Sequence, residues 1–142
     1  MLGKEMFRKV FQEFIARWEG KHPTPTDLAL TLNSVTAQDW SWYWNSWFYQ
    51  TGYADLALDN VVVNGNQLSL DVRMKGQYPV PIKLLITFVD GSTEQIYHSA
   101  LVWKNSREWS LKQSFAKPIR SVVLGDRDIP DAFTENNSYH VK

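Results

Sequence analysis

The strongest constraint on the fold is the aromatic stretch at residues 39–53, which holds four of the seven tryptophans. At ~100° per residue, a helix here places Trp42 and Tyr49 almost opposite a broad aromatic face. That face consists of Trp40, Tyr43, Trp44, Trp47 and Phe48. An amphipathic helix needs only one apolar face to reach a core, so two faces predict a short helix packed on both sides. The stretch pairs no nucleophile with a base, so it does not predict catalysis. The alternative to a structural helix is a platform on which a ligand stacks.

Two further helices are predicted before this stretch. Over residues 4–19, the apolar side chains follow the helical period and form one stripe: Phe7, Val10, Phe11, Phe14, Ile15 and Trp18. Thr24, Pro25 and Asp27 have the spacing of a cap, a first-turn proline and a reciprocal capping acid. Residues 36–39 repeat the capping pattern before the aromatic helix. Residues 1–52 are therefore expected to form a cluster of three helices.

From about residue 56 onward the apolar period changes from helical to alternating. Asn64-Gly65 predicts a hairpin turn between residues 61–63 and a half-buried strand at 67–74. Further strands are expected at residues 82–88, 94–103, 109–115 and 119–124, with a turn at Asp90-Gly91, and the tail at 126–142 is expected to be polar. The sequence thus predicts an α+β fold, in which an antiparallel immunoglobulin- or fibronectin-like β-sandwich spans residues 53–142.

Charge and composition exclude several classes of function. Fifteen basic and fifteen acidic side chains cancel, so nothing points to nucleic acid as a partner. The absence of cysteine excludes disulfides, thiolate zinc sites and cysteine catalysis. It does not fix the compartment, although a periplasmic or secreted location is slightly favoured. No apolar run reaches the ~18 residues of a membrane span, no secretion signal is visible, and the abrupt start suggests a piece of a longer polypeptide.

Few residues suggest chemistry. His22, His98 and His140 are scattered and lack the i, i+4 spacing of a zinc site. The only acidic cluster, Asp126, Asp128 and Asp131, could bind calcium but is better explained as a solvated loop, since it lacks the glycine and glutamate of an EF-hand. Trp103 and Trp109 flank a turn, where cross-strand packing is favoured over stacking on a sugar. The sequence thus assigns no catalytic residue and no metal ligand.

Three segments nevertheless resemble a known family. They are Phe11-Gln-Glu-Phe-Ile-Ala-Arg-Trp18, Lys21-His-Pro-Thr-Pro-Thr-Asp-Leu28 and Asp39-Trp-Ser-Trp-Tyr-Trp-Asn-Ser-Trp-Phe48. Together they resemble the end of the catalytic domain in bacterial gluzincin zinc aminopeptidases of the aminopeptidase N type. The following strands loosely resemble that family's β-sandwich, including Asp131 and Asn136-Asn137. The family's His-Glu-x-x-His zinc motif is absent from these 142 residues.

The resemblance implies a non-catalytic C-terminal portion of a metallopeptidase, with zinc in the parent protein and no cofactor in this chain. Its expected partner is the upstream catalytic domain of the same polypeptide, which it would buttress while shaping access to the cleft. Trp42, Tyr49 and Tyr53 are the predicted docking face, and dimerisation through an exposed helical face is a further expectation. The alternative is an independent sandwich module that binds peptide or glycan through exposed aromatics.

Overall fold

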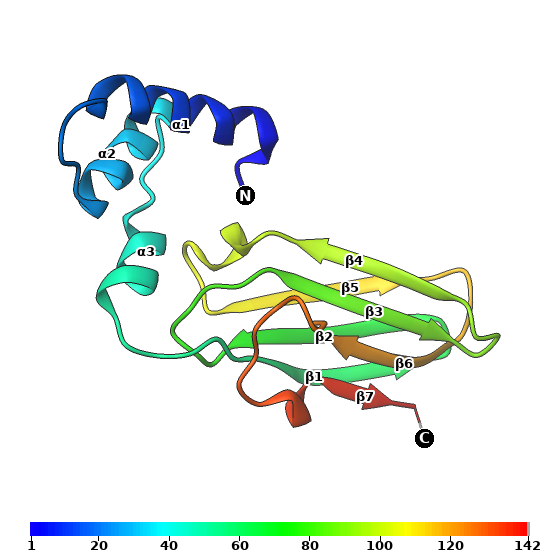
Figure 1. Cartoon of the computed structure of the whole chain (residues 1–142). Helices are drawn as coiled ribbons and strands as arrows, with labels where there is room; N and C mark the ends of the chain where they lie inside the picture. Colours follow the sequence, from blue (N-terminus) through cyan, green and yellow to red (C-terminus); the bar gives the residue numbers. More distant parts are fainter. Residues whose placement is uncertain (142) are drawn as a thin grey trace. The chain divides into compact units, whose positions relative to one another are not determined.

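The computed structural model describes residues 1–141. The chain begins with two helices that run alongside each other in opposite directions (Figure 1). These helices are α1 (Gly3–Trp18) and α2 (Pro25–Thr36), and they belong to the first of two compact units, Met1–Gln50 and Thr51–Lys142. We call these the helical unit and the sandwich unit. The predicted start of α2 is confirmed, because the backbone N–H and the hydroxyl of Thr24 both donate to the carboxylate of Asp27 at 2.8 Å.

The aromatic stretch is helical, but it is not a single α-helix that begins with a cap at Thr36. Thr36 is the last residue of α2, and its hydroxyl accepts a hydrogen bond from the Trp40 indole N–H at 2.9 Å. The next helix, α3 (Ser41–Trp44), continues into a π-helical turn, η1 (Asn45–Tyr49). Because Trp40 precedes the first helical turn and a π-turn rotates less per residue, the predicted 100° spacing does not hold across the stretch.

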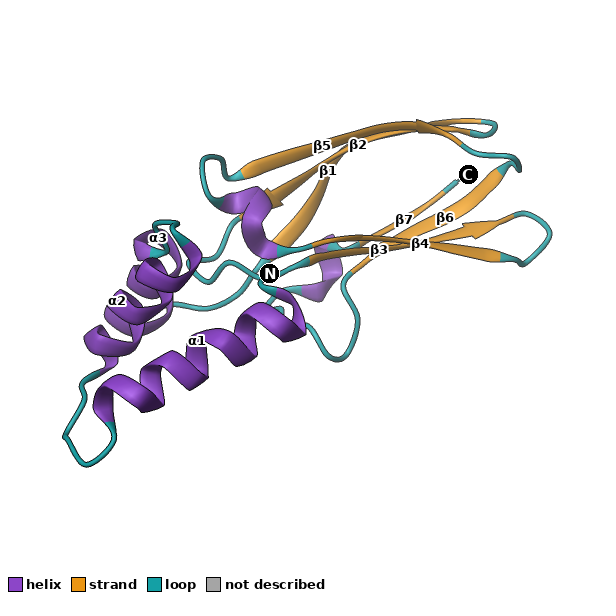
Figure 2. Ribbon diagram, turned by 90° about the horizontal axis from the view of Figure 1, so that it is seen from above, coloured by secondary structure: helices purple, strands orange, loops and turns teal. Residues whose placement is uncertain are grey.

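The sandwich unit consists of two antiparallel sheets, which Figure 2 shows as separate layers. In the first sheet, β1 (Leu56–Asn64), β2 (Gln67–Met74) and β5 (Glu108–Ser114) lie in the order β1-β2-β5. The second sheet has the order β4-β3-β6-β7, from β4 (Thr93–His98), β3 (Ile82–Phe88), β6 (Ile119–Leu124) and β7 (Ser138–His140). The predicted α+β fold class is confirmed. In an immunoglobulin constant domain the fourth strand lies in the same sheet as the first, second and fifth strands. Here β4 instead pairs with β3 in the other sheet.

The core of the sandwich lies between the two sheets and follows the alternation expected from the sequence. In β3 the side chains of Ile82, Leu84 and Ile86 are fully buried, and Leu70 and Val72 of β2 are buried to the same degree. Successive residues of a strand point to opposite faces of its sheet. The inward row of β3 therefore forms part of one inner wall of the core, and that of β2 forms part of the wall on the other sheet.

Three local predictions need correction. The loop of the first hairpin is Gly65-Asn66, one residue later than expected, with Gly65 at a φ of +60°. The strand expected at 94–103 stops at His98, and a 3₁₀ turn, η2 (Ala100–Trp103), follows because the buried Trp103 indole donates to the Val80 carbonyl at 2.7 Å. The polar tail contains η3 (Thr134–Asn136) and a seventh strand, β7, whose backbone pairs with β6.

Candidate docking surface

The helical unit has a small apolar core. Among its described residues, the apolar side chains that are fully buried are Val10, Leu32 and Trp40. Half-buried side chains pack around these three: Leu2, Val35, Trp42, Tyr43 and Trp44. The helices are therefore held together by one aromatic-rich cluster, in which Trp40 contributes the largest buried surface.

The apolar stripe of α1 is split between this core and the surface. Val10 is buried, whereas Phe7, Phe11 and Ile15 are 55%, 39% and 58% exposed. These three residues are spaced four apart, so they lie on one face of α1, and the rings of Phe7 and Phe11 are 4.6 Å apart. Single exposed apolar residues are ordinary, but a contiguous row of large ones marks an interaction site.

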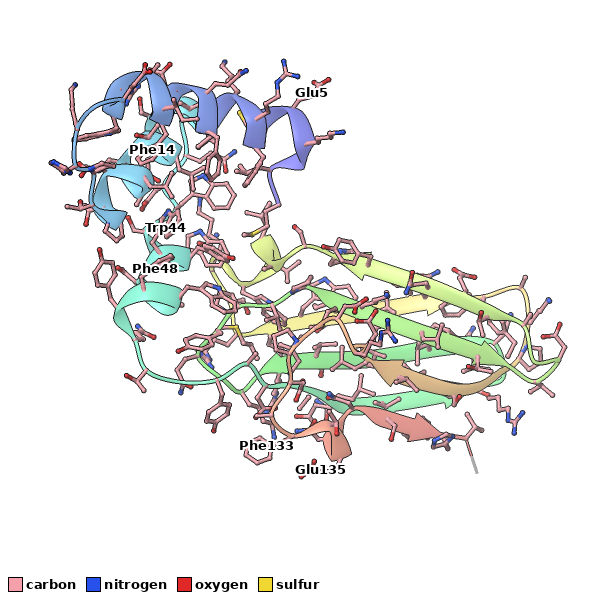
Figure 3. The ribbon with its side chains drawn as sticks, in the orientation of Figure 1. Glu5, Phe14, Trp44, Phe48, Phe133 and Glu135 are labelled. Atoms are coloured by element: carbon pink, nitrogen blue, oxygen red, sulfur yellow. The ribbon has the colours of Figure 1, made fainter. Side chains whose placement is uncertain are left out.

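A groove of about 520 Å³ adjoins this row and lies entirely within the helical unit. Its walls include Phe7 and Phe11 of α1, Leu32 of α2, and the rings of Trp40 and Trp44. Figure 3 shows Trp44 beside Phe48, and their ring centroids are 4.9 Å apart. The exposed row and the groove together form what we call the α1 surface. It is suited to receiving apolar side chains.

The predicted docking residues lie in different surroundings. The ring of Trp42 is 6.4 Å from that of Trp40 and belongs to the apolar cluster, so Trp42 does not lie opposite Trp40 as the 100° spacing predicts. Tyr49 is 64% exposed, and its hydroxyl shares a hydrogen bond with Thr26 at 3.0 Å. Tyr53 belongs to the sandwich unit, where it packs edge-on against Phe133 with centroids 5.7 Å apart. Docking through these three residues stays a prediction.

An exposed helical face was expected from the sequence, but its location on half of the α1 stripe was not, although one signal was present. Six large apolar side chains at residues 7–18 cover a broad arc of the helix. The neighbouring α2 has 12 residues and buries little more than Thr31 and Leu32. One short helix cannot cover so broad an arc, which leaves Phe7, Phe11 and Ile15 at the surface.

The acidic loop of the sandwich unit is held by the chain's own groups. Lys83 forms an ion pair with Asp126, and the hydrogen bond from Lys83 lowers the pKa of that carboxyl, as does the backbone N–H of Asp128. The carboxylate of Asp131 accepts hydrogen bonds from the backbone N–H groups of Leu56 and Phe133, both at 3.0 Å. Within residues 1–141, no three His, Cys, Asp or Glu side chains gather closely enough to hold a metal ion.

The two tryptophans of the sandwich unit pack against other residues of that unit. Trp103 is 4% exposed, and Trp109 is half-buried with its ring 4.6 Å from that of His98. Trp103 therefore has no free ring face for a sugar, and each tryptophan has its own partner. In the described part of the chain, no helix is both long enough and apolar enough to cross a membrane.

Comparison with known proteins shows a likeness to a solved structure. No protein-family model and no curated protein matches the chain. The crystal structure of Legionella pneumophila aminopeptidase A in complex with aspartic acid has a similar fold over 87% of this chain, with a TM-score of 0.63 and 17% sequence identity. The chain spans 14% of the length of that protein. At this identity the likeness shows the fold alone: both units occur together within part of a larger aminopeptidase chain.

Proposed function

We propose that this chain is the non-catalytic C-terminal portion of a zinc aminopeptidase of the gluzincin type. In this proposal the helical unit completes and buttresses an upstream catalytic domain, which holds the zinc, and helps to shape access to its cleft. Two observations support it: the sequence resemblance of residues 11–48, and the fold shared with a small part of an aminopeptidase. The chemistry would belong to the upstream domain.

The observation that carries the proposal is the exposed α1 surface. Phe7, Phe11 and Ile15 expose large apolar area beside the apolar groove. Burial of apolar surface is the main favourable term in association. The helical unit also has buried indole N–H groups on Trp42 and Trp44 that lack a hydrogen-bond partner among the described residues. A unit with a small core, an uncovered apolar face and unsatisfied donors has the properties of a piece completed by another domain.

The alternative function has less support. Pockets of about 470 and 340 Å³ in the sandwich unit have no aromatic side chain in their walls. A peptide- or glycan-binding module is expected to present an aromatic-lined groove. Tyr53, Tyr97 and Phe133 are exposed, and Figure 3 shows Phe133 projecting outward, but only Tyr53 and Phe133 pack together. The apolar groove is in the helical unit instead.

The proposal is tested by reading the coding sequence upstream of residue 1 and producing the whole polypeptide. We expect a domain with a His-Glu-x-x-His motif upstream. In the whole polypeptide, the double variant Phe7→Gln/Phe11→Gln should then weaken the contact between the helical unit and the upstream domain. Limited proteolysis within residues 1–50 should become faster, and kcat/KM on an aminoacyl reporter should fall at least several-fold. The matched control is Val89→Gln, which changes a side chain 65% exposed on the sandwich unit and should alter neither readout.

Two results would reject this function. One is an upstream sequence without any peptidase domain. The other is a double variant that digests and turns over like the parent protein. The oligomeric state of the chain alone gives a separate check: a dimer that Phe7→Gln/Phe11→Gln dissociates would assign the α1 surface to a second copy of this chain rather than to a catalytic domain.

A further inference from the structure

A cluster of polar side chains lies in the sandwich unit where the chain entering β1 meets the segment before β7. The backbone N–H of Ala132 donates to the carbonyl of Ala54 at 2.9 Å, and the N–H of Leu56 donates to the carboxylate of Asp131 at 3.0 Å. These two hydrogen bonds hold Asp55 beside the loop that leads into η3. The cluster therefore joins two segments that are about 80 residues apart in the sequence.

This cluster has more hydrogen-bond acceptors than donors. Asp55 is 5% exposed, and its carboxylate receives a long hydrogen bond, 3.5 Å, from the side-chain amide of Asn136. The side-chain oxygens of Asn136 and Asn137 are buried without a hydrogen-bond partner among the described residues, and Asn137 is only 4% exposed. Buried acceptors are costly unless a donor or a cation satisfies them. Asp55 thus has a buried carboxylate with one long hydrogen bond, next to Asn136 and its sequence neighbour Asn137, whose amide oxygens have no donor among the described residues.

The spacing between Asp55 and Asn136 suits a calcium ion. Two oxygens that bind one Ca²⁺ at ~2.3–2.6 Å from perpendicular directions lie ~3.3–3.7 Å apart. A half-turn of the Asn136 amide exchanges its nitrogen and oxygen, which puts an oxygen at the 3.5 Å position next to the Asp55 carboxylate. Asn137 lines an adjoining cavity of about 470 Å³, together with Asp131 and Thr134. This cavity has room for water ligands to complete the coordination shell.

We propose that the sandwich unit binds one Ca²⁺ between Asp55 and the side-chain oxygens of Asn136 and Asn137, with water from the adjoining cavity. A set of oxygens with a single carboxylate suits a hard cation rather than zinc, which prefers nitrogen and sulfur. The proposed ligands differ from the acidic cluster singled out in the sequence, where Lys83 already pairs with Asp126, although the acidic loop lines the same cavity. The bound ion would fasten the start of β1 to the segment that leads into β7.

The test measures thermal unfolding of the full chain in EDTA and in 0.1–10 mM CaCl₂, with MgCl₂ and NaCl at matched ionic strength. Binding to the folded state should raise the Tm on the order of 5–10 °C at 10 mM CaCl₂, if the Kd is on the order of 10⁻⁴ M. Asp55→Asn keeps the size of the side chain but removes the charge, and should abolish most of the shift. Asp128→Asn is the matched control: Asp128 is an exposed acid of the neighbouring loop, and its removal should leave the shift intact.

Isothermal titration of the unmodified chain with CaCl₂ keeps the proposal testable even if Asp55→Asn fails to fold. We expect one Ca²⁺ per chain and much weaker heats with MgCl₂. An unchanged Tm between EDTA and 10 mM CaCl₂ would overturn the proposal, as would an equal response to MgCl₂. A folded Asp55→Asn variant that responds to calcium like the unmodified chain would also overturn it, because the charged ligand would then lie elsewhere.

Discussion

Replacement of Trp40 by alanine should unfold the helical unit while the sandwich unit stays folded. Trp40 is 3% exposed, and with Val10 and Leu32 it makes up the fully buried apolar core of that unit's described residues. Its ring also stacks on Trp42, with centroids 6.4 Å apart. Removing it takes away the largest member of a very small core, so the remaining helices have little to pack against.

The expected loss in the free energy of unfolding follows from the burial of the Trp40 side chain. A buried tryptophan removes ~150–250 Å² from water, worth ~4–6 kcal/mol at ~25 cal/mol per Å². Truncations of this size in protein cores cost ~3–5 kcal/mol. The lost hydrogen bond to Thr36 adds little, because the Thr36 hydroxyl still donates to the carbonyl of Leu32 at 2.7 Å. A loss of ~3–5 kcal/mol is comparable to the whole stability of a small domain.

The assay combines urea unfolding, followed by circular dichroism at 222 nm, with amide hydrogen exchange. In Trp40→Ala, exchange should accelerate throughout α1 and α2 while the amides of β2 and β3 keep their protection. Phe48→Ala is the control, since Phe48 is 55% exposed and its removal should cost at most about 1 kcal/mol. If Trp40→Ala retains the helical signal and unfolds within about 0.5 kcal/mol of the parent protein, Trp40 is not the core of this unit.

Three further outcomes are expected. Gly76→Ala should lower the free energy of unfolding in urea by more than about 2 kcal/mol, because the added Cβ would overlap the Tyr53 carbonyl oxygen. Gly65→Ala has open space for the Cβ but a φ of +60°, and should cost only about 1–2 kcal/mol. Equal costs for the two variants would contradict the close packing around Gly76. Hydrogen bonds from Lys117 and then Ser92 lower the pKa of Asp90, so its contribution to stability is present above the unfolded pKa of ~3.9 and is lost as the pH falls through the folded value. In an NMR titration, Lys117→Met should raise that pKa toward ~3.9, and an unchanged titration would refute the pairing. Because the sequence lacks the His-Glu-x-x-His motif, we expect no stoichiometric zinc by elemental analysis and no turnover of an aminoacyl reporter by this chain alone; tight one-to-one zinc with turnover would contradict this.

Signals that act over a few residues were readable from the sequence. The reciprocal cap of Thr24 and Asp27 forms as predicted because all its partners lie within one helical turn. The inward row of β3 follows from the alternation of Ile82, Leu84 and Ile86, since a strand shows opposite faces at successive residues. The three-helix cluster and the antiparallel sandwich both follow from such local periods.

The candidate docking surface was only partly predictable from the sequence, because it depends on contacts between elements as well as on local signals. The apolar stripe of α1 was visible, but which half faces the core depends on where α2 and α3 pack. Val10 turned out to be buried and Phe7 exposed. Likewise, Trp40 and Trp47 were expected on the same aromatic face, but Trp47 is half-buried, while Trp40 lies in the core. A π-turn depends on packing that a fixed angle per residue does not represent.

The sequence by itself determined the type and order of most elements, through capping spacings, turn residues and apolar periods. Only the tertiary structure decided features whose partners are distant along the chain. Trp103 ends an expected strand because its indole reaches the carbonyl of Val80, and the polar segment Ser138–His140 becomes a strand because β6 offers it a free edge. The Asp55 cluster joins residues about 80 positions apart. Such contacts depend on which backbone groups the fold brings together, and no local pattern of side chains encodes that choice.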